Sequence, residues 1–281
     1  MKRVSIVIPS YGEAKTLKDV VNAVFASSYK EKELIVVNNG ISNEQLDKLI
    51  GVKVVGDGKN LGVAAGRNLG AKASRGDYIL FLDHDVILDT HAITRMVDVM
   101  EKDHRIGVVG PQIFYRSSPD TVWWSGGTVK LPSGRVFMDN RRCSGVRETD
   151  VVPAAIMVRR EVFERVGGFY EKYFLGFEDS DFCLSVKKNG YRVVCACEAS
   201  AYHDIDQMDL QRIFRRIFFI FRNRTLFIRR NASKPDLVIY LLFYNILFMT
   251  YYSLLVLRYG KVRLLLDIIR GTMAGMKEKI F

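Results

Sequence analysis

Cysteine and proline are scarce in this sequence, and we expect no N-terminal secretory signal. The 281 residues include only 4 Cys and 6 Pro. Four irregularly spaced cysteines do not suit the framework of a small disulfide-rich secreted domain. Cys195 and Cys197 resemble half of a zinc site, but no second pair follows, so we interpret them as ordinary strand residues. Residues 1–3 lead directly into a strand-like run that is too short for a signal-peptide core.

Acidic residues are few in the last quarter of the chain. The net charge is +11 at pH 7, and residues 205–281 hold 14 Lys and Arg against 5 Asp and Glu, so +9 of the charge lies there. This segment is also the most apolar part of the sequence, and that combination favours an anionic membrane surface. No nucleic-acid-binding motif accompanies the basic residues, so we expect no nucleic-acid partner.

Short apolar runs alternate with helical patterns over the first hundred residues. This alternation indicates βαβ units, and therefore an α/β domain with a mostly parallel central sheet. Ligands bind beyond the carboxyl ends of such strands, so the polar loops that follow the first, second and fourth strands are expected to form one site. The pattern predicts strands at 3–8, 33–37, 52–55 and 78–82, and helices near 14–27, 43–50 and 62–74.

The second half of the predicted domain has a different pattern. Residues 106–160 form short extended pieces with turns, which we interpret as the part that handles a second substrate. A helix is expected near 160–166, and another from Glu178 to an ordinary stop at Asn189-Gly190. A strand then begins at Arg192 and leads to His203.

Asp83 and Asp85 flank His84 directly after the apolar run at 78–82. In an extended segment, residues i and i+2 point to the same side, so both carboxylates can face one cation. Oxygen ligands suit Mg²⁺ or Mn²⁺, which commonly bridge a protein carboxylate and the phosphates of a substrate. The alternative is a solvated strand end.

Three further segments carry candidate chemistry. Gly62 opens a helix and Arg67 follows one turn later, which favours an anionic ligand, although a structural turn has the same pattern. Glu178 and Asp179 begin another helix. Their carboxylates suit a general base that lies near a substrate hydroxyl or, alternatively, a capping role in which the helix dipole stabilises them. His203 ends a strand and could supply an imidazole to the same cation or play a structural part.

Taken in order, these segments resemble the inverting family 2 glycosyltransferases of the GT-A fold, in particular rhamnosyltransferase-like and polysaccharide-assembly members. The resemblance covers roughly residues 3–204 and implies a nucleotide-sugar donor and a Mg²⁺ or Mn²⁺ cofactor. It implies an α/β, Rossmann-like GT-A domain at 1–204, followed by a helical region at 205–281. It rests on Val4–Tyr11, Glu33–Gly40, Asn60–Gly62, Gly66–Asn68, Asp83–Asp85, Gly167–Phe169, Phe174, Glu178–Asp181 and His203.

The resemblance also implies a role for each matching residue. Asp179 corresponds to the catalytic base, and Glu178 beside it binds the acceptor or positions that base. Asp85 ligates the metal directly, and His203 completes its site. The expected nucleotide-sugar site consists of Pro9, Ser10, Tyr11, Asn38, Asn60, Gly62, Arg67, Asp83 and His84, with Asp83 also in the metal shell.

Two residues depart from the family pattern. Gly12 follows Tyr11 where the family usually has Asn, and Asn38 stands where the family usually has Asp. Both positions concern the base of the nucleotide. The metal and base positions are intact.

The tail predicts attachment to a membrane. Residues 212–230 place Ile and Phe on one side of a helix and Arg on the other, which suits a membrane interface or, alternatively, packing on the catalytic domain. Leu237–Leu257 contains no charge and is long enough to span a bilayer. We therefore expect residues 212–257 to bind a lipid surface and the catalytic domain to face the cytoplasm. The expected acceptor is a glycan or a polyprenyl-linked saccharide, and a homo-oligomer is left open. The alternative function is a membrane-attached nucleotide-sugar-binding scaffold without transferase activity.

Overall fold

The computed structural model describes residues 1–12, 15–47, 49–205 and 210–280. Residue 14 of the first predicted helix and residue 48 of the second lie outside these ranges. The chain forms two compact units, which we call the sheet unit and the helical unit. The predicted division at residue 204 stays a prediction. The sheet unit comprises Met1–Thr128, Met138–Phe174 and Glu178–Ile205, and the helical unit comprises Val129–Phe137, Leu175–Phe177 and Asp206–Phe281.

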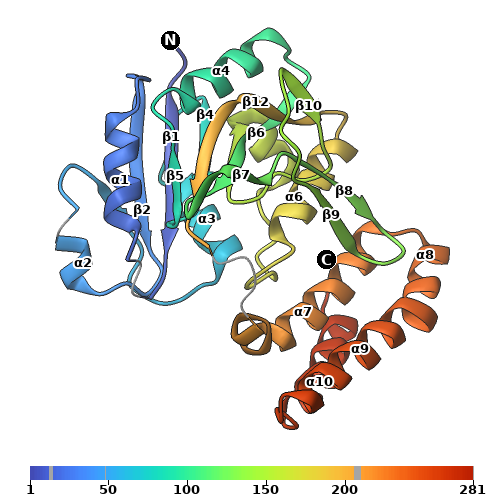
Figure 1. Cartoon of the computed structure of the whole chain (residues 1–281). Coiled ribbons are helices and arrows are strands. Elements are labelled where there is room, and N and C mark those ends of the chain that lie inside the picture. The colour runs from blue at the N-terminus through green and yellow to red at the C-terminus, as the bar shows by residue number, and fades with distance from the viewer. Residues whose placement is uncertain (13–14, 48, 206–209, 281) are drawn as a thin grey trace. The chain divides into compact units, whose positions relative to one another are not determined.

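A ten-stranded mixed sheet forms the centre of the sheet unit (Figure 1). Its main path runs β10-β12-β6-β11-β4-β1-β2-β3, with β5 paired to β12 and β7 paired to β6. The strands are β1 (Val4–Ser10), β2 (Lys32–Asn38), β3 (Lys53–Val55), β4 (Tyr78–Leu82), β5 (Val86–Leu88), β6 (Ile106–Tyr115), β7 (Ser118–Trp124), β10 (Val146–Glu148), β11 (Ala155–Arg159) and β12 (Arg192–His203). A separate two-stranded sheet pairs β8 (Gly126–Lys130) with β9 (Arg135–Asp139).

The first four predicted strands pair in parallel, as the βαβ pattern predicts. β1 lies between β4 and β2, and every residue of β1 and β4 is buried. A strand covered on both faces is expected to be continuously apolar, and β4 is built from Tyr, Ile, Leu and Phe. The strand β11 is antiparallel to both β4 and β6, so the sheet is mixed.

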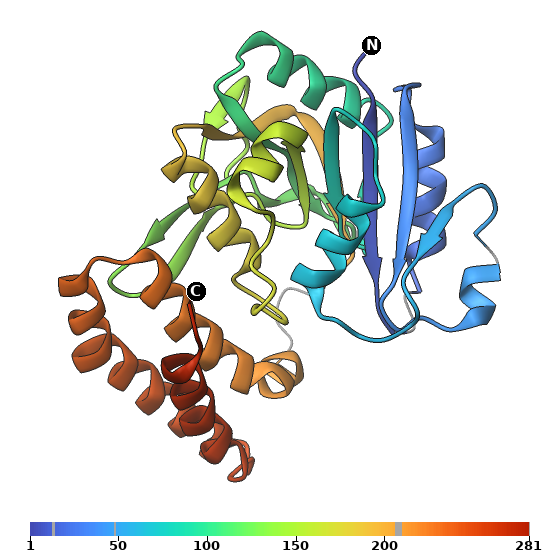
Figure 2. The same ribbon diagram turned by 180° about the vertical axis from the view of Figure 1, so that it is seen from behind.

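Helices cover both faces of this sheet. Figures 1 and 2 show α1 and α4 on one face and α3, α5 and α6 on the other. A Cβ on Gly70 of α3 would clash with Val7 of β1, so this glycine permits close helix–sheet packing. The helices are α1 (Leu17–Ala26), α2 (Asn43–Asp47), α3 (Val63–Lys72), α4 (Ala92–Lys102), α5 (Arg160–Val166) and α6 (Glu178–Lys188). The sequence pattern did not predict the helix α4.

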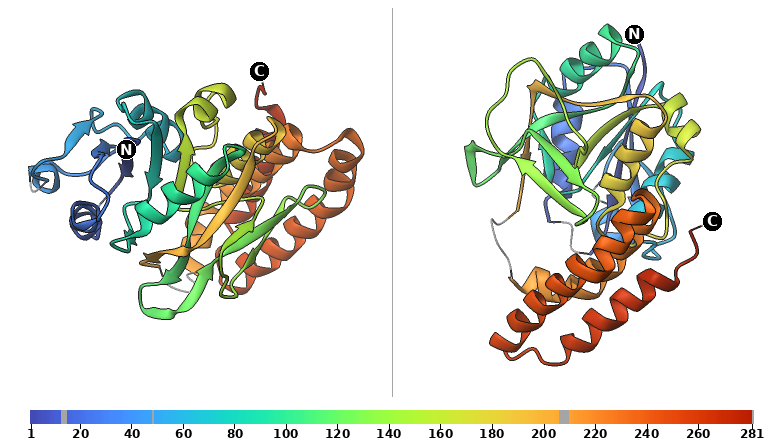
Figure 3. Two further views of the ribbon diagram at one scale, coloured as in Figure 1. Left: turned by 90° about the horizontal axis from the view of Figure 1, so that it is seen from above. Right: turned by 90° about the vertical axis from the view of Figure 1, so that its right-hand side faces the viewer.

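The helical unit is built on the long helix α7, and Figure 3 shows α9 and α10 as neighbouring helices joined by a short turn. Phe214, Ile217 and Phe221 of α7 pack against Val256 and Ile268 in a small core. These three residues of the predicted apolar face thus pack inside the helical unit, and membrane binding by residues 212–230 stays a prediction. The elements are α7 (Leu210–Asn231), α8 (Lys234–Ile239), the π-helical turn η1 (Tyr240–Tyr244), α9 (Asn245–Arg258) and α10 (Leu264–Lys277).

The helix α10 packs closely on α7 through two glycines. A Cβ on Gly271 would clash with the carbonyl oxygen of Phe218, and a Cβ on Gly275 would clash with that of Arg222. Small residues four apart allow two helix backbones to approach in this way. Arg222 also pairs with Glu278 at 2.6 Å, beyond the end of α10.

The exposed apolar surface of the helical unit lies on the segment after α7. Residues Lys234–Arg258 form a helix of 25 residues that is long and apolar enough to cross a membrane by length and composition, with a mean hydropathy of 1.6. Only 11% of its apolar window is buried. Its exposed members include Leu242, Phe243, Ile246, Leu247, Tyr251 and Leu254.

The cysteines differ from the prediction. Cys143 and Cys197 form a disulfide with a Cα–Cα distance of 5.4 Å, so Cys197 is not an ordinary strand thiol. Cys195 is a buried free thiol, as expected. The two bonded residues lie 54 positions apart, and no sequence pattern joins them.

Candidate active site

The carboxyl ends of three adjacent strands hold the predicted polar loops. β1 ends at Ser10, which pairs in register with Asn38 at the end of β2. β4 lies on the other side of β1, and Asp83 follows its last residue. The order β4-β1-β2 therefore brings the three loops to one edge of the sheet.

Arg67 joins two of the predicted carboxylates. Its side chain comes from α3, is 0% exposed, and forms ion pairs with Asp179 and with Asp83, the latter at 2.8 Å. Burial lowers the pKa of a guanidinium, but Asp179 and Asp83 outweigh this effect and hold the pKa of Arg67 above its ordinary value. We expected Arg67 near the nucleotide or its diphosphate. In the structure it is enclosed, and both of its terminal nitrogens pair with protein carboxylates.

The backbone of Ala154 also connects these two acids. Its carbonyl oxygen accepts the N–H of Asp83 at 2.8 Å, and a backbone hydrogen bond from Ala154 favours the ionised form of Asp179. Ala154 has φ +61°, and among the described residues the other non-glycine with positive φ is Phe177, at +74°. Such conformations are costly and gather at functional sites. Ala154 contacts Asp83 through its backbone, and Phe177 directly precedes Glu178.

Glu178 and Asp179 open α6 as neighbouring carboxylates, of which Glu178 is buried and Asp179 is half-buried. Burial, followed by the charge of Asp179, raises the pKa of Glu178 to about 7. Burial also raises the pKa of Asp179, and the Arg67 guanidinium opposes this rise. One oxygen of Glu178, Oε2, is buried and has no hydrogen-bond partner among the described residues. Glu178 can therefore be protonated near neutral pH beside Asp179, whose carboxylate is held by the guanidinium of Arg67.

Asp85 and His203 face each other at the end of β12. Asp85 Oδ1 lies 3.3 Å from His203 Nε2, and the imidazole is buried with its edge against Trp123, whose ring centre is 4.5 Å away. An oxygen and a nitrogen donor suit Mn²⁺ or Mg²⁺ that also binds phosphate oxygens, so these residues fit the predicted metal. Asp83 was predicted as a further metal ligand, but its carboxylate is bound by Arg67.

Among the described residues, the group of three or more His, Cys, Asp or Glu side chains close enough to hold an ion is Cys143, Cys195 and Cys197. Two of these are joined by the disulfide, which leaves a single free thiol. We therefore draw no zinc site from them.

The remaining predicted nucleotide residues line the loops in different ways. Ser10 Oγ is buried without a hydrogen-bond partner in the described structure, while Tyr11 is exposed and follows Pro9 and Ser10 directly. Asn38 was expected to contact the base, but its Oδ1 accepts the N–H groups of Gly40 and Ile41, both at 3.1 Å. These two hydrogen bonds use Oδ1 and leave the side-chain nitrogen Nδ2 of Asn38 for a ligand.

Asn60 and His84 help to shape the same loops. Asn60 Oδ1 accepts the N–H of Gly62 at 3.0 Å, and Gly62 has φ +82° at the N-terminus of α3. The carbonyl oxygen of His84 accepts the hydroxyl of Thr16 at 2.8 Å. Both contacts order the loop backbone, and the nucleotide-binding roles of Asn60 and His84 stay predictions.

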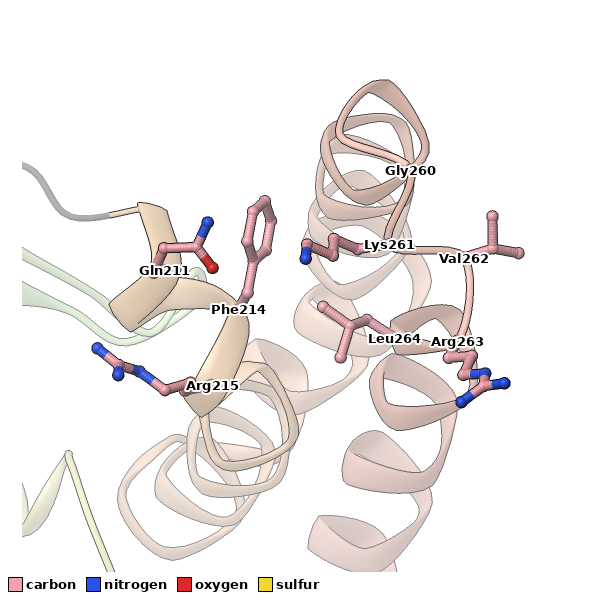
Figure 4. Close-up of a pocket in the computed structure, with 8 residues that line it drawn as sticks. All are labelled: Gln211, Phe214, Arg215, Gly260, Lys261, Val262, Arg263 and Leu264. Carbon is pink, nitrogen blue, oxygen red and sulfur yellow. The ribbon is translucent and has the colours of Figure 1, made fainter.

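One pocket of the helical unit is lined by none of the predicted site residues. It has a volume of about 540 Å³ and lies in the helical unit between the start of α7 and the turn before α10. Figure 4 shows Lys261 and Leu264 extending toward Phe214, while Val262 and Arg263 point away. This pocket has no pair of acids, so it offers no catalytic chemistry of the predicted kind.

Sequence reasoning missed Trp123 and Ala154. Trp123 packs on His203, and the adjacent pair Trp123-Trp124 in the sequence is a signal that could have drawn attention to the segment. Ala154 acts through its backbone alone, so no side-chain pattern could have identified it.

A protein-family model described as "Glycosyl transferase family 2" matches residues 5–167. Over 126 residues the chain is 29% identical to the poly-beta-1,6-N-acetyl-D-glucosamine synthase of Staphylococcus aureus strain COL, covering 42% of this chain and 31% of that protein. It is 26% identical over 222 residues to the O-antigen biosynthesis protein RfbC of Myxococcus xanthus, covering 72% and 17% respectively. The chain thus spans a third or less of these relatives.

Two solved structures show the same fold. The mannosyltransferase PcManGT from Pyrobaculum calidifontis, in complex with GDP-Man and Mn²⁺, has a TM-score of 0.60 at 14% identity and covers 99% of this chain and 88% of its own. TarS 1–349 of S. aureus, in complex with UDP-GlcNAc, has a TM-score of 0.62 at 15% identity and covers 96% and 81%. The predicted α/β GT-A fold is confirmed.

Proposed function

Because this chain belongs to glycosyl transferase family 2, we propose that it transfers a sugar from a nucleotide-sugar donor to a hydroxyl group, with inversion and with a divalent cation. The observation that carries the proposal is that Arg67 of α3 joins Asp83, at the end of β4, to Asp179 of α6, while Asp85 and His203 form a second, facing pair. The donor then occupies the loops after β1 and β2, with the base and ribose beside Pro9, Ser10 and Tyr11.

The chemistry assigns a separate task to each acid. Asp179 accepts the proton of the acceptor hydroxyl while that oxygen attacks the anomeric carbon, and the diphosphate leaves with the electron pair of its bond to the sugar. Asp85 and His203 would hold the cation, and the cation would supply Lewis-acid stabilisation for the charge of the departing diphosphate. Arg67 holds Asp179 in position, and Glu178 lies beside that base to bind the acceptor or orient it.

The metal assignment predicts that transfer stops when the cation is removed. We expect EDTA to abolish transfer from a labelled nucleotide sugar and Mn²⁺ or Mg²⁺ to restore it. Asp85→Asn weakens the cation site, so this variant should need at least about tenfold more Mn²⁺ for half-maximal rate, the lower range for disturbed metal sites. The measurement is the rate against free Mn²⁺ across a screen of donors.

Asp120→Asn is the matched control for this experiment. Asp120 is a fully exposed carboxylate of β7 in the same unit, so the wild-type metal dependence should persist. Turnover that ignores EDTA would contradict the metal assignment. Donor binding without transfer in any condition would instead favour a nucleotide-sugar-binding scaffold.

We also propose that the acceptor is lipid-linked, and that the catalytic unit works on the cytoplasmic side of a membrane. The exposed apolar residues of Lys234–Arg258 support membrane attachment. A pocket of about 250 Å³ in the helical unit combines Arg212 and Arg216 with apolar side chains and with the backbone before Glu178, which suits a phosphorylated lipid. The relatives are named for the synthesis of poly-beta-1,6-N-acetyl-D-glucosamine and for O-antigen biosynthesis, and we propose a task of this kind for this chain.

The membrane proposal predicts the effect of removing exposed leucines from the apolar helix. The full-length variant Leu242→Gln, Leu247→Gln, Leu254→Gln should lose at least about tenfold in affinity for vesicles that contain an anionic lipid, since 1.4 kcal/mol corresponds to a factor of ten. Flotation with anionic and neutral vesicles measures this. Ile50→Gln, at an exposed residue of the sheet unit, is the control, and unchanged flotation of the triple variant would refute the attachment.

A further inference from the structure

Three residues of the helical unit stand directly before the carboxylate pair. Leu175, Gly176 and Phe177 belong to the helical unit, whereas Glu178 and the rest of α6 belong to the sheet unit. The peptide bond between Phe177 and Glu178 therefore joins the two units at the first residue of the candidate active-site helix. Whatever fixes residues 175–177 also sets where α6 begins.

Asn223 of α7 fixes the backbone of this segment. Its side chain is 0% exposed, and its Nδ2 donates to the carbonyl oxygens of Leu175 at 2.9 Å and Gly176 at 3.0 Å. Its Oδ1 accepts from the guanidinium of Arg222 at 2.8 Å. Both amide protons and the carbonyl oxygen are thus used, so the amide has one orientation. Two consecutive carbonyl groups are held by one buried side chain.

Two further residues of α7 contact Phe177. The rings of Phe177 and Phe227 lie 5.3 Å apart, and the guanidinium of Arg224 lies 6.0 Å from the ring of Phe177. Phe177 has φ +74°, a conformation that a non-glycine residue keeps only when its surroundings impose it. Asn223, Arg224 and Phe227 therefore form a seat for residues 175–177, which we call the α7 seat.

The other end of the segment is held within the sheet unit. The carbonyl oxygen of Phe174 accepts the N–H of Val63 at 2.8 Å, and Gly62 lies so close to Phe174 that it has no room for a Cβ. Val63 begins α3, the helix that carries Arg67. The segment before Glu178 is thus fixed at residue 174 by α3 and at residues 175–177 by α7.

We propose that Asn223 is a positioning residue for the reaction, which acts by holding the backbone before Glu178 and Asp179 in the orientation that the acceptor hydroxyl requires. This inference rests on the proposed function, because it assigns Asn223 a part in that same reaction. A general base must lie within hydrogen-bond reach of the proton that it takes, and a misplacement of 1 Å can cost a factor of 10². Asn223 acts through the backbone of Leu175 and Gly176 and not by contact with the donor or the acceptor.

Asn223→Asp tests the inference with almost no change in volume. The carboxylate keeps an acceptor for Arg222 but presents an oxygen, instead of an N–H, to the carbonyl groups of Leu175 and Gly176. We expect kcat to fall by about 10–100-fold, with the KM for the donor within twofold. Asn223→Gln restores a donor on a longer side chain and should recover part of kcat. Hydrogen exchange of residues 175–182 should accelerate in Asn223→Asp.

Thr225→Val is the matched control. Thr225 is buried on the same helix, and its hydroxyl pairs with that of Tyr240 at 3.0 Å rather than with a carbonyl group of residues 175–177. This variant loses a buried hydrogen bond of α7 but keeps the seat, so kcat and the exchange of 175–182 should stay near those of the wild type. The comparison separates a positioning role from general loss of stability in the helical unit.

The outcomes distinguish this inference from the proposed function. Absence of transfer by the wild-type chain with every donor would remove the proposed function, while exchange of residues 175–182 would still report on the seat. An active wild type with unchanged kcat in Asn223→Asp would overturn the inference. Equal losses in Asn223→Asp and Thr225→Val, with equal exchange at 175–182, would reduce Asn223 to a structural residue and overturn it as well.

Discussion

Replacing Arg67 with methionine is expected to lower the free energy of unfolding by about 3–5 kcal/mol, the range for removing one partner of a buried ion pair. The guanidinium is fully enclosed and pairs with both Asp83 and Asp179. Methionine fills a similar volume but leaves two carboxylates facing each other beside Glu178. The measurement is urea unfolding followed by circular dichroism, with activity recorded under native conditions.

Two controls define this result. Arg67→Lys keeps a charge but cannot form the same fork to two carboxylates, so it should fall between the wild type and Arg67→Met. Arg105→Met removes an exposed arginine that pairs with Asp103 at 3.2 Å, and such surface pairs contribute about 0–1 kcal/mol. If Arg67→Met unfolded within 1 kcal/mol of the wild type, the proposed electrostatic centre would be wrong.

Asp179→Asn is expected to reduce turnover by about 10²–10⁴-fold while donor binding stays largely intact, because the variant loses the proton acceptor but keeps the shape of the side chain. Single-turnover transfer and titration with the nucleoside diphosphate measure the two quantities separately. Near-normal turnover would show that Asp179 is not the base.

Glu178→Gln provides the comparison at the neighbouring position and carries a pH signature. The pKa of Glu178 is raised from 4.5 to about 7, mainly by burial, so the folded state holds a proton that the unfolded state releases. The associated stability is complete below pH 4.5 and is lost as the pH rises through 7. Glu178→Gln keeps the neutral form at all pH values, so it should raise the unfolding free energy above that of the wild type at pH 8 and match it near pH 4.5.

The sequence was sufficient for the sheet edge and the family. Residues 78–82 are uniformly apolar because β4 is buried on both faces, and that run marked the strand whose end carries Asp83. The family identified from the ordered motifs is confirmed by the model that matches residues 5–167. Motifs of this kind survive in sequence because the chemistry depends on particular side chains at strand ends.

The sequence was not sufficient for contacts that depend on distant backbone. Arg67 was recognised as a site residue, but its enclosure between Asp83 and Asp179 requires α6 to return to α3 more than a hundred residues later. The apolar side of α7 was interpreted as a lipid-facing surface, since a helical pattern identifies an apolar face but not what covers it. The disulfide between Cys143 and Cys197 was not predicted for the same reason, because it joins residues that lie 54 positions apart in the sequence.

The cytoplasmic placement has a consequence for that disulfide. Cytosolic thiols are kept reduced, so the proposal expects Cys143 and Cys197 to be free in the cell and bonded only after oxidation.

The two glycines of α10 have a consequence for how the protein tolerates change. Gly271 and Gly275 let α10 rest on the carbonyl groups of Phe218 and Arg222 in α7, and Arg222 directly precedes Asn223. A single added methyl group at either position has to move a helix whose side chains seat the start of α6. Genetic screens for loss of function should therefore recover alterations near the C-terminal end, in residues that meet no substrate at all.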